Sequence, residues 1–380
     1  MNEYILIKNF GPIKEIELKD IRPLTIFIGE SGSGKSTIMK TLILFRWIFK
    51  MICIRSYLKE SGISKSPFRF NFLPYLKNNG LESFIKEDTH IKYQFEECII
   101  EYKNGKLHTP QNTSLSYVSL EKNCFISDKR NLIADMISNN TTKSSAGFYL
   151  KETFNDYNLA TKEVRELKFD YLGVKFKVEK SNGIDKHSIE GIEDDEYKIN
   201  LEDASSGTQT VTPLSLIIEY FSRNYNLVKS FNSAILRYLS DNDNLSDFKA
   251  VKNAGEIGNR RVNIHIEEPE LSLYPESQRS LINFIVNRCF TEKPTDYDIT
   301  VMMATHSPYI INHINLLVMA AQKGQVEDGA NIRLEDVNVY EIIDGYLNDL
   351  KQEDSFVIDT RPLSDPITNI YERFEELKQL

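Results

Sequence analysis

The sequence has few of the features that mark secreted, zinc-binding or membrane-spanning chains. It contains four cysteines, at positions 53, 98, 124 and 289, and no two of them form a CxxC pair. A disulfide framework or a zinc site is therefore not expected, and a reducing cytoplasm is the expected location. The N-terminus, MNEYILIKNF, has neither the basic region nor the apolar run of a signal peptide.

Long apolar runs and repeats are also missing. The most apolar long stretch, Leu42 to Ile54, is interrupted by Arg46 and Lys50, so it predicts a buried helix rather than a membrane span. There is no internal repeat and no sustained heptad run, which excludes a long coiled-coil arm. The net charge of −9 argues against wholesale wrapping of nucleic acid, although it is compatible with a local basic patch. We therefore expect a soluble protein without a membrane partner.

What the 380 residues do contain is an alternation of strand and helix patterns. Apolar strands at 4–7, 13–18 and 24–28 precede a helical stretch, and buried strands at 261–266 and 299–304 are each followed by a helix. This alternation predicts an α/β fold with a largely parallel core sheet. We expect one domain over residues 1–380. Its expected parts are an inserted β/helical region at 51–200, a helical insertion at 210–258, and C-terminal strands and a helix at 320–380.

The strongest motif is GESGSGKS, residues 29–36, which matches the phosphate-loop pattern GxxxxGK[ST] in full. Its glycines let backbone N–H groups converge on the phosphates of a nucleotide, and the following helix adds its positive N-terminal end. Lys35 is expected to reach the β- and γ-phosphates, Ser36 to bind Mg²⁺ and Thr37 to touch the α-phosphate. The other expected nucleotide-binding residues are Gly29, Ser31, Gly32, Ser33 and Gly34.

Two further strands end in residues that suit nucleotide hydrolysis. NIHIEEPE, residues 263–270, ends in adjacent acids, and we assign Glu267 to the magnesium ion and Glu268 to the attacking water. Two acids after a strand can equally be solvated, but together with a phosphate loop they favour catalysis. MMATHSP, residues 302–308, carries His306 directly after a buried strand. A lone histidine is more often structural, yet this position favours a sensor of the γ-phosphate. Lys35, Glu268 and His306 are the expected catalytic residues.

The order of these motifs resembles the ATP-binding-cassette (ABC) ATPases, and within them the soluble SMC- and OLD-like branch. EEPE followed by LSLYP, the NFGPIKE turn and the tail segment VYEIIDG are similar to that branch. The resemblance covers about residues 1–50, 200–225 and 260–380. It implies an ABC-type P-loop fold with a parallel core sheet, an N-terminal antiparallel β-subdomain and a helical insertion. It also implies ATP and Mg²⁺ as cofactors.

The resemblance further implies a signature sequence that contacts the nucleotide of a second subunit. ASSGTQ, residues 204–209, stands where that signature is expected, so Ser205, Ser206 and Gly207 are candidates for contacts in trans. The alternative is an ordinary turn that caps a helix. The segment departs from transporter signatures, because Ala204 and Ser206 stand where leucine and glycine are usual, and closure in trans is less secure for that reason.

Arg130 is the candidate from the middle of the chain. It lies in FISDKRN, residues 125–131, which is similar to a strand-then-arginine motif of the family. The resemblance implies a charge near the nucleotide or at a dimer interface. Two further departures concern Glu267, which stands where aspartate is common, and the glutamine loop, which cannot be assigned because Gln94 lies in a predicted strand.

These features favour an ATPase that closes as a nucleotide-sandwich homodimer, or a higher homo-oligomer, and opens on hydrolysis. By resemblance, such subunits act in bacterial DNA repair or antiphage defence as sensor, regulatory or scaffold subunits. The effector, such as a nuclease, is expected to be a separate protein, because few residues follow His306 and no E…DxD cluster suits a nuclease metal site.

Two other functions stay open on the sequence. One is a nucleotide-gated scaffold with negligible turnover, and the other is a transporter-type ATP-binding subunit. A ring motor is the least favoured, because the signature and the histidine switch belong to clamps. DNA contact is a further open question. The chain has two modest clusters of basic residues, although such clusters in an acidic protein are usually solvated faces. The basic residues concerned are Lys50, Arg55, Lys59, Lys65, Arg260 and Arg261.

Overall fold

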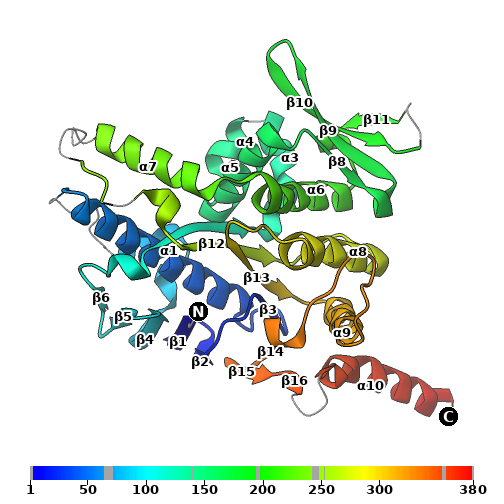
Figure 1. Cartoon of the computed structure of the whole chain (residues 1–380). Helices are drawn as coiled ribbons and strands as arrows, with labels where there is room; N and C mark the ends of the chain where they lie inside the picture. The colour runs from blue at the N-terminus through cyan, green and yellow to red at the C-terminus, as the bar shows by residue number, and fades with distance from the viewer. Residues whose placement is uncertain are drawn as a thin grey trace.

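The structure is a computed structural model that describes residues 3–63, 72–138, 140–193, 197–241, 248–251, 253–352 and 357–378. Lys65, one of the basic residues considered above, lies outside the described residues. Eleven strands of the described part form one mixed sheet in the order β6-β5-β4-β1-β2-β15-β14-β3-β13-β12-β7 (Figure 1). Among the helices of the described ranges, none has the length and apolar character needed to cross a bilayer.

One half of this sheet is parallel, and we call it the parallel half. β3 pairs with β14 on one side and β13 on the other, and β12 lies between β13 and β7. The expected α/β fold with a parallel core is therefore confirmed. The strands are β3 (Leu24–Ile28), β7 (Ser119–Ile126), β12 (Asn259–Glu267), β13 (Asp298–Thr305) and β14 (Val337–Ile343).

The other half is antiparallel and includes the expected N-terminal strands. β15 (Tyr346–Asp349) joins the two halves, because it pairs antiparallel with β14 and meets β2 in parallel at Tyr346 and Glu15. The antiparallel half therefore continues the core sheet. Its strands are β1 (Glu3–Phe10), β2 (Ile13–Leu18), β4 (Ile85–Phe95), β5 (Cys98–Lys103) and β6 (Lys106–His108).

Helix α1 (Lys35–Glu60) runs between the two halves of the sheet (Figure 1). Its sequence is apolar on nearly all sides, which is typical of a buried helix. Phe49 packs on Phe95 of β4 with ring centroids 4.8 Å apart, while other faces of α1 contact β7, β12 and β13. The expected boundary at residue 51 falls inside this helix, and the region 51–200 supplies both edge strands, β6 and β7, of the main sheet.

The remaining described elements surround this core. α6 packs on α5 and α8, and α8 packs on α9. The helices are α2 (Phe72–Asn78), α3 (Ile133–Ser138), α4 (Asn140–Ser145), α5 (Phe148–Glu163), α6 (Ser206–Glu219), α7 (Leu227–Asp241), α8 (Pro275–Val286), α9 (Pro308–Gln322) and α10 (Arg361–Lys378). A separate antiparallel sheet contains β8 (Glu166–Phe169), β9 (Val174–Ser181), β10 (Ile184–Gly191) and β11 (Lys198–Asn200), and β16 (Lys351–Gln352) pairs with β17 (Val357–Ile358).

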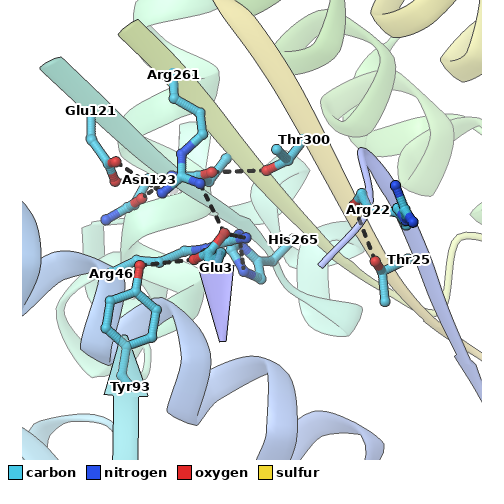
Figure 2. Close-up of polar contacts among 11 residues, drawn as sticks. Glu3, Arg22, Thr25, Arg46, Tyr93, Glu121, Asn123, Arg261, His265 and Thr300 are labelled. Carbon is cyan, nitrogen blue, oxygen red and sulfur yellow. Dashed lines mark hydrogen bonds and ion pairs between the residues drawn. The ribbon is translucent and has the colours of Figure 1, made fainter. Parts of the chain in front are cut away.

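A cluster of polar side chains is buried where α1 meets the two halves of the sheet (Figure 2). Glu3 of β1 is its centre. One Glu3 oxygen accepts hydrogen bonds from Arg46 of α1 and Tyr93 of β4, both at 2.8 Å, and the other accepts from Arg46 and from Arg261 of β12 at the same distance. Arg261 also donates to Glu121 of β7 at 2.9 Å. We call this the buried polar cluster; it comprises Glu3, Arg46, Tyr93, Glu121, Asn123, Arg261, Asn263, His265 and Thr300.

The charges of this cluster compensate one another. Burial alone would raise the pKa of Glu3, but Arg261 and Arg46 hold it well below its usual range, so the carboxylate is ionised. His265 lies 3.2 Å from Arg46, and burial together with that positive charge keeps the pKa of His265 far below its usual value. The cluster thus contains two carboxylates, two guanidinium groups and a neutral imidazole, and it ties β1 to α1 and β12.

Acidification from pH 7 to pH 5 is expected to lower the unfolding temperature, because three histidines are neutral in the folded chain; His265 and His313 are buried, and His187 is half-buried. Burial lowers the pKa of His187 and of His313 to about 4, and it lowers the pKa of His265 well below its usual value. The unfolded chain takes up these protons below about pH 6.5, whereas the folded chain does not until near pH 4. Stability is therefore full above this window and is lost as the pH falls through it.

Scanning calorimetry at pH 7 and pH 5 measures this effect. The substitution His187→Gln should reduce the loss of unfolding temperature, since it removes one of the titrating groups. The matched substitution His108→Gln, at an exposed position, should leave the loss unchanged. An unfolding temperature that stays the same between the two pH values contradicts the prediction.

Candidate nucleotide-binding site

The phosphate loop connects β3 to α1 and has the conformation that its glycines permit. Gly29, Gly32 and Gly34 have φ angles of 147°, 79° and 114°, in the region that side chains disfavour. Gly34 is also constrained by space, because a Cβ atom at this position would lie 2.4 Å from Ile13 Cδ1 of β2. The loop thus lies against the antiparallel half of the sheet, and the positive φ angle at its last turn favours glycine.

Lys35 arches back over the loop. Its Nζ donates hydrogen bonds to the carbonyl oxygens of Gly29 and Glu30, both at 2.8 Å. Burial lowers the pKa of Lys35, while the negative charges of Glu268 and Glu270 oppose that shift. The ammonium group is therefore held above a concave loop of backbone N–H groups, where the phosphates of a nucleotide can replace the two carbonyl contacts.

The motifs from separate strands meet at one edge of the parallel half. In the sheet register Glu267 of β12 is opposite Ala304 of β13, and Ala304 is opposite Phe27 of β3, so the carboxyl ends of three strands lie side by side. A pocket of about 430 Å³ opens at this edge. It is lined by Pro12, Ser31, Gly32, Gly34, Lys35, Ser36, Thr37, Phe84, Glu268, Ala304 and His306. The structure thus brings the predicted acid and histidine to the phosphate loop.

The other two predicted loop residues, Gly29 and Ser33, line a neighbouring pocket of about 670 Å³ on the side of β14. That pocket also contains Lys14 and the turn from Glu341 to Gly345. The VYEIIDG segment of the tail therefore lies against the phosphate loop. Phe84 and Pro12, which sequence reasoning did not assign, give the first pocket an apolar wall.

Glu268 and His306 face each other across the pocket. His306 Nε2 is 3.8 Å from Glu268 Oε1, and the Glu268 N–H donates to the Ala304 carbonyl at 2.8 Å. Glu268 has a φ angle of 45°, so the chain turns sharply after Glu267 and directs the two acids differently. Burial, followed by the charge of Glu270, raises the pKa of Glu268. A carboxylate with a raised pKa beside a phosphate loop suits a general base for water.

Glu270 is a residue of this site that sequence reasoning missed. Its Oε1 accepts the backbone N–H of His306 at 2.6 Å, which joins the end of β12 to the end of β13. Its Oε2 is buried without a hydrogen-bond partner among the described residues. The only sequence signal was the fourth letter of EEPE. Glu270 therefore acts as a positioning residue, because it fixes the segment that carries His306.

Arg130, expected near the nucleotide or at a dimer interface, lies behind the two acids at the end of β12. Its side chain is 1% exposed and lines neither pocket at the phosphate loop. The guanidinium donates to the carbonyl oxygens of Glu267 and Glu268, each at 2.7 Å, and to that of Thr210 in α6 at 3.1 Å. Burial lowers the pKa of Arg130 to about 10. In this structure the residue holds the backbone that carries both acids.

The signature candidates lie at the start of α6. Ser205 caps this helix, because its Oγ accepts the Thr208 N–H at 3.3 Å. Within one chain, Ser205 therefore makes the contact of an ordinary helix cap. We call residues 267–274, which join the end of β12 to α8, the acidic loop. Gly207 packs so closely on this loop that an added Cβ atom would lie 2.9 Å from the Ser272 carbonyl oxygen. Ser205 and Ser206 are exposed, and none of the three lines the pocket of its own chain.

The donors expected for Mg²⁺ are Ser36 and Glu267. Ser36 is the second residue of α1, and Glu267 ends β12 with its side chain buried. In the described part of the chain, no group of three or more His, Cys, Asp or Glu side chains could hold a metal. A nucleotide-bound magnesium ion needs only one or two protein oxygens, because phosphate and water supply the others. One hydroxyl and one carboxylate therefore fit such an ion.

Comparison with known proteins bears on this site. Residues 78–311, more than half of the chain, match the family described as AAA ATPase domain. The chain belongs to the AAA ATPase domain family. Membership implies that this AAA ATPase binds ATP and hydrolyses it. The matched residues begin after the phosphate loop, so the loop is assigned by its motif and its geometry.

Two solved structures are similar to this AAA ATPase. The SMC head domain from Thermotoga maritima has 11% sequence identity over 93% of this chain and 100% of that chain, with a TM-score of 0.34. The recombination mediator protein RecF-ATPrS of the RecFOR pathway has 12% identity over 92% of this chain and 98% of that chain, also with a TM-score of 0.34. No curated protein matches the chain.

Proposed function

We propose that this AAA ATPase is an ATP-driven clamp, in which two copies enclose two ATP molecules and separate after hydrolysis. The observation that carries the proposal is the pocket that unites the phosphate loop with Glu268 and His306. When bound with ATP, Mg²⁺ would be held by Ser36 and Glu267 and would neutralise phosphate charge. Lys35 then binds the β- and γ-phosphates, Glu268 takes a proton from the attacking water, and His306 contacts the γ-phosphate.

Closure in trans is supported by the exposed start of α6. Ser205 and Ser206 are exposed. They lie beside the acidic loop, since Thr210 Oγ1 donates to the Leu271 carbonyl at 3.2 Å and Gly207 packs on Ser272. The helix N-terminus carries unpaired N–H groups and a positive dipole end, which suit the γ-phosphate of a second copy. In the proposed clamp this contact is lost when the γ-phosphate leaves, so the dimer opens.

The mass of the protein with and without nucleotide tests the clamp. Light scattering with Mg²⁺ and a non-hydrolysable ATP analogue should show twice the monomer mass, and the nucleotide-free protein should show a smaller species. Ser206→Arg should prevent the increase without weakening nucleotide binding, because the added side chain lies on the exposed face of the helix. Ser233→Arg, at an exposed position of α7, is the matched control. Monomers at saturating analogue contradict the proposal.

We further propose that the clamp is the sensor, regulatory or scaffold subunit of a bacterial antiphage-defence or DNA-repair complex, with a separate effector such as a nuclease. The support is the similarity of EEPE and LSLYP to the SMC- and OLD-like branch. Phage challenge and DNA-damage survival of cells with wild-type or Lys35→Ala protein test this setting, and equal outcomes in both assays contradict it. DNA remains a possible partner, but Arg261 is not available for such a contact, because it is buried in ion pairs with Glu3 and Glu121.

A nucleotide-gated scaffold with negligible turnover is the second candidate. It is favoured by one observation, the ion pair between Glu267 and Lys40, which engages the carboxylate expected to bind Mg²⁺. Steady-state phosphate release separates the two functions, since the clamp requires turnover that Glu268→Gln abolishes.

A further inference from the structure

Lys40 lies beside the carboxylate that is expected to serve Mg²⁺. It is in α1, one turn after Ser36, and residues four apart share a helix face. Its Nζ is 3.1 Å from Glu267 Oε1. The Glu267 side chain is only 4% exposed, and that of Lys40 is 25% exposed. The carboxylate is therefore nearly inaccessible to water, and it is paired with the Lys40 ammonium group.

Two aromatic rings complete the surroundings of Lys40. The ammonium lies 5.8 Å from the ring centre of Phe125 and 5.3 Å from that of Tyr149, and the two rings are 4.1 Å apart. A cation is attracted to the face of an aromatic ring at such distances. Lys40 thus has two favourable partners within reach, the carboxylate and the ring pair, and it can leave the first without losing the second.

The charges make Lys40 and a metal ion compete for Glu267. A buried carboxylate without a counter-ion is strongly unfavourable, so the Lys40 contact stabilises the protein when no metal is bound. A magnesium ion at Glu267 would place its two positive charges close to the ammonium. The negative phosphates of ATP offset that repulsion, and in the nucleotide-free protein it is not offset.

We propose that Lys40 is the resident counter-ion of Glu267 and withholds this carboxylate from Mg²⁺ until a nucleotide is present. When phosphates and metal arrive together, the Lys40 ammonium moves away from Glu267 and stays over Phe125 and Tyr149. Metal and nucleotide binding are then coupled through one lysine, so the protein does not bind divalent cations on their own. This inference rests on the nucleotide and Mg²⁺ site of the proposed function, and not on dimer formation.

Binding of Mn²⁺ to the nucleotide-free protein tests the inference. Mn²⁺ is used as the probe because electron paramagnetic resonance measures its free concentration. Wild type should show no site at Glu267 up to the highest Mn²⁺ concentration used, whereas Lys40→Met should bind one Mn²⁺ per chain with a dissociation constant at least tenfold below that concentration. Methionine has a similar length and packs on the rings, but it leaves the carboxylate without a counter-ion. The double variant Lys40→Met/Glu267→Gln should lose the new site.

The controls separate this effect from a general loss of positive charge. Lys143→Met removes another lysine that lies over a ring, 4.8 Å from the centre of Phe154, and should bind Mn²⁺ as wild type does. Lys40→Gln serves if the methionine variant does not fold, and the same result is expected of it. A wild-type level of Mn²⁺ binding in the folded Lys40 variant overturns the inference, and so does a new site that survives Glu267→Gln.

A second measurement distinguishes failure of this inference from failure of the proposed function. Titration with a fluorescent ATP analogue gives the nucleotide affinity with and without Mg²⁺. The factor by which Mg²⁺ strengthens nucleotide binding should be at least tenfold smaller in Lys40→Met than in wild type, because coupling is reciprocal. An equal factor in the two proteins contradicts the role of Lys40, whereas no nucleotide binding by wild type contradicts the site itself.

Discussion

Replacement of Glu268 by glutamine is expected to slow ATP hydrolysis by about 10²–10⁴-fold, the usual contribution of a general base. Glu268 lines the pocket with Lys35 and faces His306 at 3.8 Å. Glutamine keeps the size of the side chain but cannot accept a proton from water. Nucleotide binding should persist, so the variant should accumulate in the ATP-bound dimer, which steady-state phosphate release and light scattering measure.

The matched control for this variant is Glu276→Gln, at an exposed position in the first turn of α8. It should hydrolyse ATP at the wild-type rate. The raised pKa of Glu268 adds a pH dependence. Since the base must be ionised, wild-type hydrolysis should fall on acidification at a higher pH than an ordinary glutamate would give. Undiminished phosphate release by Glu268→Gln shows that another group activates the water.

The phosphate loop and its catalytic partners were predictable from the sequence because their signals are local. GxxxxGK[ST] between a strand and a helix fixes its own conformation, and Gly34 has a φ angle of 114°, which residues with a side chain rarely adopt. Glu268 and His306 were predictable for a second reason. Each follows a buried strand, and the carboxyl ends of parallel strands meet at one edge of a sheet, where the structure places both at the pocket.

Arg130 and Glu270 show what the sequence could not provide. Their types suggest surface charges, but one donates to the carbonyl oxygens of the acidic loop and the other accepts the His306 N–H. These partners are backbone groups more than thirty residues away, so no spacing rule identifies them. The sequence predicts C-terminal strands within 320–380 but not the position of β15, because a short strand that joins two halves of a sheet is defined by its neighbours.

The buried polar cluster could not be predicted from the sequence either. It connects α1, the helix that follows the phosphate loop, to both halves of the sheet. Glu3 appears as an ordinary acid near the N-terminus, and Arg46 as an interruption in an apolar helix. In the fold, Glu3 accepts from Arg46, Arg261 and Tyr93 (Figure 2). Three segments distant in the chain therefore depend on one carboxylate.

Glu3→Ala is accordingly expected to reduce the free energy of unfolding by about 3–5 kcal/mol, the cost of leaving buried charges without their partner. Arg46 and Arg261, whose side chains are only 1% and 4% exposed, would keep their charges without the Glu3 carboxylate, and Tyr93 would lose its acceptor. Urea unfolding measures the change. Glu15→Ala removes an acid whose side chain is 51% exposed and pairs with Lys8, so it should cost no more than about 1 kcal/mol. Equal losses in the two variants would contradict this prediction. They would mean that water solvates the arginines when Glu3 is removed, so that the Glu3 contacts are no stronger than a surface ion pair.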